Sequence, residues 1–440
     1  AAGFVESSLE MYVTDFKRAV EIEPSEMIQL VLDNKESIPV CYIDSMLAGA
    51  AFSKKQDTVS LEIWEKMFDC FHCDKDRQRA VYFCMIIEKL DIFDWSLDVL
   101  KQLKQIANNY MDIEGAEQNF REMDSETLFN KTLNIVSGDV ARAIGHLLWE
   151  KAELIDIFRD TIEALCTNKN SAIQMASMFA LWPTYNFDRD WAEEKIMNLY
   201  ENDIRMAAFQ NSKDMFFLLY HRFGNQVLNI VLKCFASKDK RLIEVGGHAL
   251  CEFYLLEEEF ADTLADVDSF NESQIQSILE MAILYLNNDE YRERAKDIIL
   301  KCTSSNCNIE YPLSKMFFDS LVDARRDSEF LIEIMNSKVN KRLIYSFVHF
   351  LEENAFTLKE FSGVIIALCR NVLNNIEEKE QFWIVGDYIS KLIIALYDEY
   401  VCAKDQNGKA VAEECLDLWD IMFEKQIGQT RELSRELMER

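Results

Sequence analysis

Cys70-Phe-His-Cys73 is the one segment of this sequence whose residue types and spacing match a metal or redox motif. A structural zinc site needs four ligands, usually from two such pairs. No second C-x-x-C occurs, although Cys302 and Cys307 lie near each other in the sequence. A redox C-x-x-C normally opens a helix after a strand, whereas this pair follows the end of an expected helix. We therefore interpret both cysteines as ordinary thiols and predict no metal and no cofactor.

The five histidines, at positions 72, 146, 221, 248 and 349, include no H-E-x-x-H motif and no pair at helical i, i+4 spacing. Such a pair would place two zinc ligands on one face of a helix. His146 and His248 occupy the same place in two similar segments of the chain. Repetition at one structural register favours packing or an inter-helix hydrogen bond over a ligand role.

The motifs of several catalytic classes are missing. The sequence has no G-x-x-x-x-G-K-[ST] phosphate loop and no G-x-S-x-G nucleophile elbow. It also has no Asp-Asp dipeptide, which the all-helical prenyl-chain enzymes use to bind metal. We therefore predict no catalytic residue and expect that this chain is not an enzyme.

Three segments look like copies of one helix. Asp139–Trp149 aligns with Ala172–Trp182 at an offset of 33 residues, and the pattern returns at Arg241–Cys251. Each copy contains small residues flanked by aliphatic ones, and we expect the small residues to be buried where helices approach closely. A period in the thirties with one such helix per unit is typical of a stacked helical repeat. Repeats of this kind display a long surface and usually bind rather than catalyse.

Helical patterns cover most of the chain, and 12 Gly and 4 Pro in 440 residues are too few for an all-β fold. We predict an all-α protein, an α-solenoid of paired antiparallel helices wound into a superhelix. Residues 1–137 would form irregular helices or degenerate repeats, 138–356 the repeat array, and 357–440 a C-terminal cap of longer helices. Ser137-Gly138 breaks the apolar pattern and marks the first boundary.

The connections between helices are expected to be short polar corners, such as Asn168–Ser171 and Ser237–Lys240, whose Ser, Asn and Asp side chains cap helix N-termini. Pro183 is expected to end a helix at Trp182, because proline cannot continue the helical hydrogen bonds.

The net charge is −30, from 77 acidic and 47 basic residues. Nucleic-acid binding needs a basic surface, so we expect no nucleic acid as a partner, and an anionic membrane is disfavoured for the same reason. The acidic excess suits exposed helix faces that keep a large protein soluble, and a basic protein partner is the alternative. With no run of 18 apolar residues, no visible signal peptide and 12 cysteines mostly in apolar stretches, we predict a reducing, cytoplasmic location without a membrane span.

Three tryptophans cluster in the repeat region. Trp149 and Trp182 share one register of the repeat, which favours buried packing between repeats. Trp191 opens the following helix and is expected to be the more exposed member, so we count it as a candidate for partner contact.

Arg142, Gln174 and Glu244 are polar positions of the small-residue helices. If these helices stack as one layer, the three side chains stand in a row along one face. Inner helices of a curved repeat array line a concave groove where partners usually bind. We predict that this row faces the groove and contacts the partner.

Asp139-Val140-x-Arg142 resembles the opening of the second helix in a HEAT repeat, where an aspartate-type cap and a valine precede a basic residue. A longer stretch, about 138–260, resembles the C-terminal HEAT-like region of large bacterial signalling NTPases of the NACHT/STAND type, which are relatives of animal and plant immune receptors. The segments that carry this resemblance are, in order, Leu147-Leu-Trp149, Ser171-Ala-Ile-Gln174, Tyr185-Asn-Phe-Asp188, the helices over 213–223 and 225–235, Ala236-Ser-Lys-Asp239 and Val245-Gly-Gly-His-Ala249. In that family the repeats sense a ligand, often a foreign protein, and a central P-loop ATPase is held inactive.

The resemblance implies a sensor segment of a bacterial antiviral-defence NTPase with a protein or peptide ligand, and it transfers no functional residue. The absence of a P-loop and of an initiator Met suggests a fragment of a longer protein, and oligomerisation would then arise only in that parent. Two alternatives stay open. One is a free-standing HEAT/armadillo-type scaffold or adaptor. The other, which the acidic charge disfavours, is an all-helical enzyme such as a base-excision glycosylase.

Overall fold

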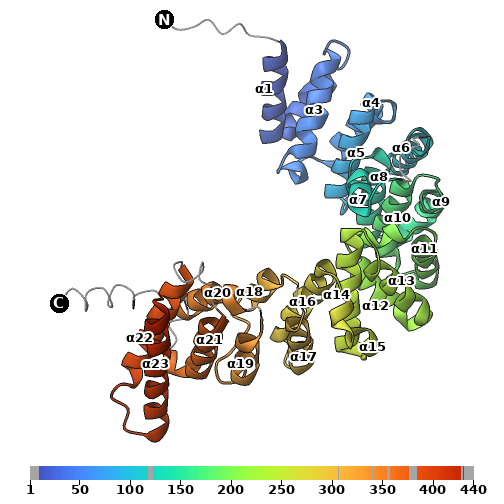
Figure 1. Ribbon diagram of the computed structural model, residues 1–440. Coiled ribbons are helices and arrows are strands. Elements are labelled where there is room, and N and C mark those ends of the chain that lie inside the picture. Colours follow the sequence, from blue (N-terminus) through green and yellow to red (C-terminus); the bar gives the residue numbers. More distant parts are fainter. Residues whose placement is uncertain are drawn as a thin grey trace, which may run out of the picture. The chain divides into compact units, whose positions relative to one another are not determined.

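The computed structural model describes residues 9–116, 122–305, 307–338, 340–353, 357–375, 384–427 and 430. Within these ranges the regular structure consists of 23 α-helices and short 3₁₀ turns, with no strand. The predicted all-α class is therefore confirmed (Figure 1). The contacts divide the chain into two units, Ala1–Ile230 and Val231–Arg440.

The first unit is built from helices that pack on near neighbours in the chain. Their bounds are α1 (Leu9–Ile22), α2 (Pro24–Asp33), α3 (Val40–Phe52), α4 (Leu61–Phe71), α5 (Arg77–Lys89), α6 (Leu97–Gly115), α7 (Ser125–Leu133), α8 (Val136–Glu150), α9 (Ile155–Cys166), α10 (Ser171–Thr184), α11 (Arg189–Asn202) and α12 (Ser212–Phe223). One row runs α1, α3, α5, α8, α10, with each helix packed on the next, and a second row runs α2, α4, α6, α9 (Figure 1). Helix α13 (Asn225–Phe235) crosses the division between the units.

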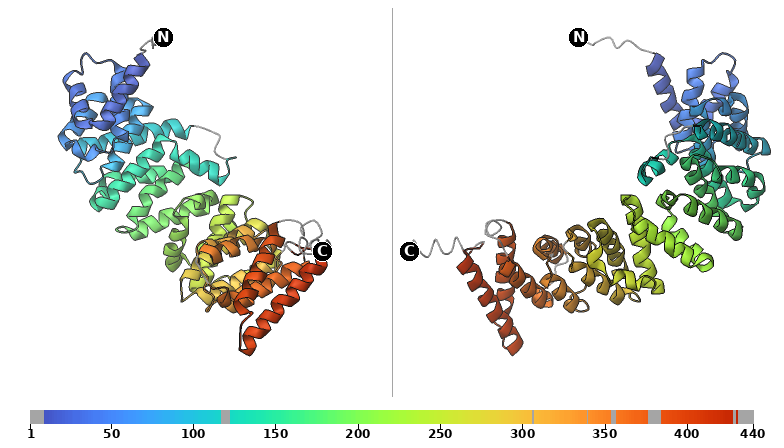
Figure 2. Two further views of the ribbon diagram at one scale, coloured as in Figure 1. Left: turned by 90° about the vertical axis from the view of Figure 1, so that its left-hand side faces the viewer. Right: turned by 45° about the vertical axis from the view of Figure 1, so that its right-hand side comes forward.

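The second unit repeats this pattern. Its helices are α14 (Lys240–Glu257), α15 (Ala261–Leu264), α16 (Glu272–Leu284), α17 (Arg292–Thr303), α18 (Glu310–Phe318), α19 (Ser328–Asn336), α20 (Asn340–Glu353), α21 (Ser362–Asn375), α22 (Ile384–Tyr400) and α23 (Gln406–Lys425). Helices α14, α16, α18, α20 and α22 pack in succession, as do α17, α19, α21 and α23 (Figure 2). Contact between alternate helices thus builds both units.

Short polar side chains begin several helices. The Asp76 carboxylate accepts hydrogen bonds from two backbone N–H groups at the start of α5. At the start of α10 the Asn170 side chain accepts one from the backbone N–H of Ala172 at 2.9 Å, and Asp239 caps α14 in the same way. Such caps satisfy donors that the first turn of a helix leaves unpaired. The polar corners around positions 170 and 239 therefore work as the sequence predicts.

Small residues lie at the close helix contacts, which confirms that part of the repeat interpretation. The buried members are Ala143, Gly145, Ala176, Gly246 and Gly247. A Cβ atom added at Gly145 would lie 2.4 Å from the carbonyl oxygen of Phe179 in α10, and one at Gly246 would lie 2.4 Å from the backbone nitrogen of Phe235. Any larger side chain at either position would push the backbones apart.

Two helix ends differ from the prediction. Helix α8 begins at Val136, so Ser137 and Gly138 lie in its first turn rather than in a break, and Asp139 lies inside the helix rather than at its start. The cause is distant in sequence: the buried carboxylate of Glu114 in α6 accepts the backbone N–H groups of Val136 and Ser137 at 2.8 and 3.1 Å.

The end of α10 is the second difference. Pro183 lies in the last turn of the helix, which ends at Thr184 rather than at Trp182. Proline has no N–H to donate to the carbonyl of the residue four positions earlier, which here is Phe179. One proline in a last turn therefore costs a single helical hydrogen bond, and the helix continues for one more residue.

Candidate functional site

A cavity of about 520 Å³ opens beside α8 and α10 in the first unit, and we call it the α8–α10 cavity. Helix α8 contributes four residues to its wall and α10 two. The rest come from the ends of α5 and α7 and from the segment before α12. The lining residues are Glu88, Leu133, Arg142, Gly145, His146, Trp149, Phe179, Trp182, Phe209, Gln210 and Asn211.

Trp149 and Trp182 both line this cavity, as their shared register leads one to expect. The prediction that they are buried between repeats is wrong, because Trp149 is 50% exposed and Trp182 is half-buried. The close contact between α8 and α10 is made at Gly145, one turn before Trp149. The indole of Trp149 therefore lies beyond the crossing point and faces the cavity.

Two phenylalanines form the apolar wall of the α8–α10 cavity. The rings of Phe179 and Phe209 meet edge to face, with their centroids 4.9 Å apart and their planes at 75°. Phe209 is buried and Phe179 is half-buried. Aromatic pairs in this arrangement hold a fixed geometry, so the wall is preformed.

Charged side chains lie on the α5 side of the cavity. The guanidinium of Arg142 pairs with Asp139 one turn earlier in α8, and its Nε lies 3.5 Å from Oε2 of Glu88. His146 Nδ1 lies 3.2 Å from Oδ2 of Asp91, and its Nε2 lies 3.7 Å from Oε1 of Glu88. Three carboxylates thus surround one permanent cation and one histidine.

Asp139 is the most perturbed member of this cluster. Burial raises its pKa to about 7, and the negative charges of Glu88 and Glu114 act in the same direction. The neighbouring Arg142 lowers the pKa but does not offset the burial. The charge of the cluster therefore changes near neutral pH.

The predicted partner-binding residues lie in different places. Arg142 lines the cavity, whereas Gln174 is half-buried on α10 and does not. Gln174 is one position away from the residue that matches Arg142 at the repeat offset, and one residue turns a helix by about 100°. Glu244 belongs to the second unit, where it lies 3.9 Å from Arg241 in α14. The expectation that Trp191 is the most exposed of the three tryptophans is wrong, because Trp191 is half-buried whereas Trp149 is exposed. The guanidinium of Arg159 lies 4.7 Å from the centre of the Trp191 ring.

The two histidines of equal register have the role that the repeat predicts. His146 contacts Asp91, which follows α5, and Nε2 of His248 in α14 lies 3.3 Å from Oε2 of Glu280 in α16. The hydrogen bond from His248, together with Lys315, lowers the pKa of Glu280 to about 2. Each histidine therefore pairs with a carboxylate outside its own helix.

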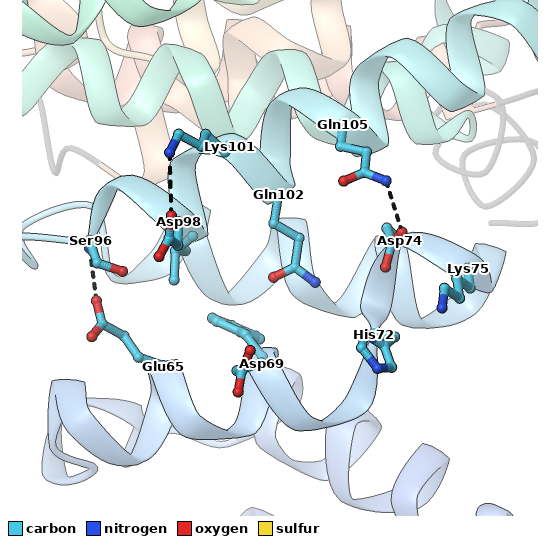
Figure 3. Close-up of a pocket in the computed structure, with 12 residues that line it drawn as sticks. Glu65, Asp69, His72, Asp74, Lys75, Ser96, Asp98, Lys101, Gln102 and Gln105 are labelled. Carbon is cyan, nitrogen blue, oxygen red and sulfur yellow. Dashed lines mark hydrogen bonds and ion pairs between the residues drawn. The ribbon is translucent and has the colours of Figure 1, made fainter.

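A second cavity, also of about 520 Å³, lies between α4 and α6 (Figure 3). Its lining includes His72 and is largely polar, and hydrogen bonds cross the gap at two places. The Glu65 carboxylate accepts the backbone N–H of Ser96 at 2.7 Å, and the Gln105 amide donates to Asp74 at 3.2 Å. Because these groups already have partners, we regard the cavity as a polar helix–helix boundary.

The cysteine pair lies at the end of α4. Cys73 is buried, and burial raises the pKa of its thiol to about 12. Cys70 is half-buried, with its sulfur 3.6 Å from Nζ of Lys35. In the described part of the chain, no group of three or more His, Cys, Asp or Glu side chains is placed to hold a metal ion.

The sequence reasoning missed Glu88, Asp91, Phe179 and Phe209. A signal existed for Phe179 alone, because it takes the place of His146 at the repeat offset. Glu88 lies near the end of α5 and Asp91 follows this helix, and both are outside any recognised repeat copy. The packing of α5 on α8 brings them beside Arg142 and His146.

No protein-family model matches this chain, and no curated protein is significantly similar to it in sequence. None of the helices in the described ranges is long and apolar enough to cross a membrane.

Proposed function

We propose that this chain is a non-catalytic recognition module, an α-solenoid that binds a protein or peptide at the α8–α10 cavity. The contact between alternate helices within each unit supports the solenoid part, because stacked repeats touch mainly their neighbours. The observation that carries the binding part is the pair of unburied tryptophans, Trp149 and Trp182, on the wall of one cavity.

The size and chemistry of the cavity fit this role. Its volume of about 520 Å³ falls within the usual range of ligand sites, roughly 300–1,000 Å³. Such sites combine aromatic walls with a few polar groups that fix orientation, as Phe179 and Arg142 do here. Tryptophan is also enriched among the residues that dominate the energy of protein interfaces.

A defined selection tests the binding proposal. A phage-displayed peptide library is panned on the purified chain, and each enriched peptide is titrated against the double variant Trp149→Ala/Trp182→Ala. We expect the double variant to lose about 2 kcal/mol or more of binding free energy, the usual effect of removing an interface hot spot. Trp191→Ala is the matched control, because the indole of Trp191 is already covered by Arg159. This variant should bind the peptides as tightly as the wild type does. Enriched peptides that bind the double variant as well as the wild type would contradict the proposal.

We further propose that the module is the sensor segment of a NACHT/STAND-type NTPase, on the strength of the resemblance over about 138–260. The test is the reading frame that encodes the chain. A P-loop motif in the same frame supports the proposal. A complete frame without one overturns it in favour of a free-standing scaffold.

A further inference from the structure

We infer that the α8–α10 cavity receives an arginine side chain of a protein partner, whose guanidinium stacks on the indoles of Trp149 and Trp182 and faces the carboxylate of Glu88. This inference rests on the function proposed above, and it adds the chemistry of the occupant. It follows from the lack of a stacking partner on the two indole rings among the described residues, from the charges around them and from the arginine–aromatic contacts elsewhere in the same unit.

The two indoles are uncovered. Across the described ranges, neither Trp149 nor Trp182 has an aromatic ring or a cationic side chain over it. Other large rings of the first unit do have such a partner: Arg159 lies 4.7 Å from the centre of the Trp191 ring, and Arg189 lies 5.0 Å from that of Tyr185. The unit thus covers aromatic faces with guanidinium groups from its own chain, and these two faces are left for a group from outside.

The charges beside the rings favour a cation. Glu88 lies on the cavity wall, and the guanidinium of Arg142 beside it is already paired with the buried Asp139. The contacts of Glu88 with Arg142 and His146 are long, at 3.5 and 3.7 Å. Since a carboxylate can accept about four hydrogen bonds, Glu88 keeps acceptor capacity for a donor that enters the cavity. An anionic ligand would instead be repelled by the carboxylate of Glu88.

Arginine suits this arrangement better than lysine does. A guanidinium is planar, so it can stack on an indole while its edge donates two parallel hydrogen bonds to a carboxylate. An ammonium group is a compact, strongly hydrated charge without a flat face. The net charge of −30 adds long-range attraction for a basic partner.

The test uses small probes and fluorine NMR. The chain is labelled with 5-fluorotryptophan, and the resonances of positions 149, 182 and 191 are assigned with single Trp→Phe variants. N-acetyl-arginine methylamide is then titrated in, in parallel with the lysine and the citrulline analogues. Citrulline has the shape of arginine without its charge. We expect the arginine probe to shift the resonances of positions 149 and 182, with position 191 unchanged and the citrulline probe inactive.

Two variants test whether the carboxylate of Glu88 contributes to binding beyond the general effect of removing one negative charge. Glu88→Gln should weaken the arginine probe about tenfold, a loss of one charge-assisted hydrogen bond. Glu150→Gln is the matched control, because Glu150 is exposed at the end of α8 and does not line the cavity. This variant should bind the probe as the wild type does. Circular dichroism confirms that both variants fold.

Several outcomes would overturn the inference. They are unchanged resonances up to the solubility limit of the arginine probe, equal shifts from lysine or citrulline, and unchanged affinity in Glu88→Gln. The experiments also distinguish failure of the arginine inference from failure of the proposed recognition function. Cavity-dependent peptides that lack arginine would keep the recognition function and remove the arginine inference. Arginine-probe binding without any cavity-dependent peptide would remove the recognition function and leave the arginine preference of the cavity standing.

Discussion

Glu114 in the first unit and Asp327 in the second are both buried carboxylates, but their hydrogen-bond partners differ in kind. In the first unit Glu114, 3% exposed, accepts the first backbone N–H groups of α8 and the hydroxyl of Ser137 at 2.7 Å. In the second unit Asp327, 1% exposed, is held by the guanidinium of Arg292 and by Nζ of Lys296 at 2.8 Å.

The difference lies in what remains when the carboxylate is removed. The partners of Glu114 are dipoles of a helix start, which water or a neighbouring side chain can satisfy. The partners of Asp327 are two buried cations, and an uncompensated buried charge is costly. The cluster around Asp327 is therefore more sensitive to loss of its carboxylate than the cluster around Glu114.

The largest effect is expected for Asp327→Ala. Loss of one partner of a buried ion pair costs about 3–5 kcal/mol. Here the buried Arg292 loses its carboxylate, and Lys296 keeps only its contact with the exposed Glu293. Urea unfolding followed by hydrogen exchange in α17 and α19 measures the change. Asp289→Ala is the control, because Asp289 pairs with Arg326 while 83% exposed, and such surface pairs contribute about 0–1 kcal/mol. Equal losses for the two variants would contradict the prediction.

Glu114→Ala should lower the free energy of unfolding by less, about 1–3 kcal/mol, which is the usual penalty for leaving buried hydrogen-bond donors unpaired. The loss should be local, so hydrogen exchange at Val136 and Ser137 should accelerate more than exchange in α17. Glu126→Ala is a suitable reference because Glu126 is an exposed residue in the first turn of α7. If Glu114→Ala destabilises the chain as much as Asp327→Ala does, the distinction between dipolar and ionic partners fails.

Asp139 and Asp327 make the stability of the chain depend on pH in opposite directions. The folded pKa of Asp139, about 7, lies above the ordinary value, so its contribution to stability is complete below about pH 4 and is lost as the pH rises through 7. Asp327 has the opposite behaviour. Burial alone would raise its pKa, but the hydrogen bonds from Arg292 and Lys296 lower it below the ordinary value. Its contribution is therefore present above about pH 4 and is lost in acid.

The measurement for Asp139 is the free energy of unfolding of Asp139→Asn and of the wild type between pH 5 and 8. Asparagine resembles the protonated carboxyl, so the stability of the variant relative to the wild type should rise with pH. We expect a change on the order of 1–2 kcal/mol, because Arg142 offsets part of the burial penalty. A difference that stays constant or falls with pH would show that Asp139 remains ionised throughout.

The smallest effect concerns the thiols, which can report on each unit separately. Cys402 is exposed, whereas Cys84 and Cys302 are buried with raised pKa values. A disulfide reagent should label Cys402 rapidly, and Cys402→Ser should remove that phase without loss of stability. In Asp327→Ala, labelling of Cys302 in α17 should accelerate while Cys84 in α5 stays slow. The reverse order of labelling would place the weak point in the first unit.

The sequence was sufficient for the features that depend on local periodicity. Apolar spacing predicted helices throughout, and the small residues of the three copies, such as Gly145 and Gly246, lie at close helix contacts as expected. The equal register of His146 and His248 also predicted their similar role. These conclusions use either the period of a helix or the offset between similar segments, and both can be read directly from the sequence.

Features that depend on contacts across the chain were missed. The start of α8 is set by Glu114, which lies in a different helix, so the local pattern at Ser137 and Gly138 misleads. The exposure of Trp149 depends on where α8 crosses α10, which a shared register does not specify. Gln174 was placed beside Arg142 although it is one residue out of register, and a slip of that size changes the face of a helix.

The contact between Gly145 and the Phe179 carbonyl has a consequence for the search for relatives. A Cβ atom at position 145 would lie 2.4 Å from that oxygen, so no residue other than glycine fits there. The surrounding aliphatic residues can be replaced by other aliphatic residues. The oxygen is also the one that Pro183, four residues later, leaves without its helical donor. A glycine in one helix and a proline at the end of the next should therefore persist in diverged sequences after overall similarity has disappeared. These two positions are therefore the ones by which we expect relatives of this chain to be recognised.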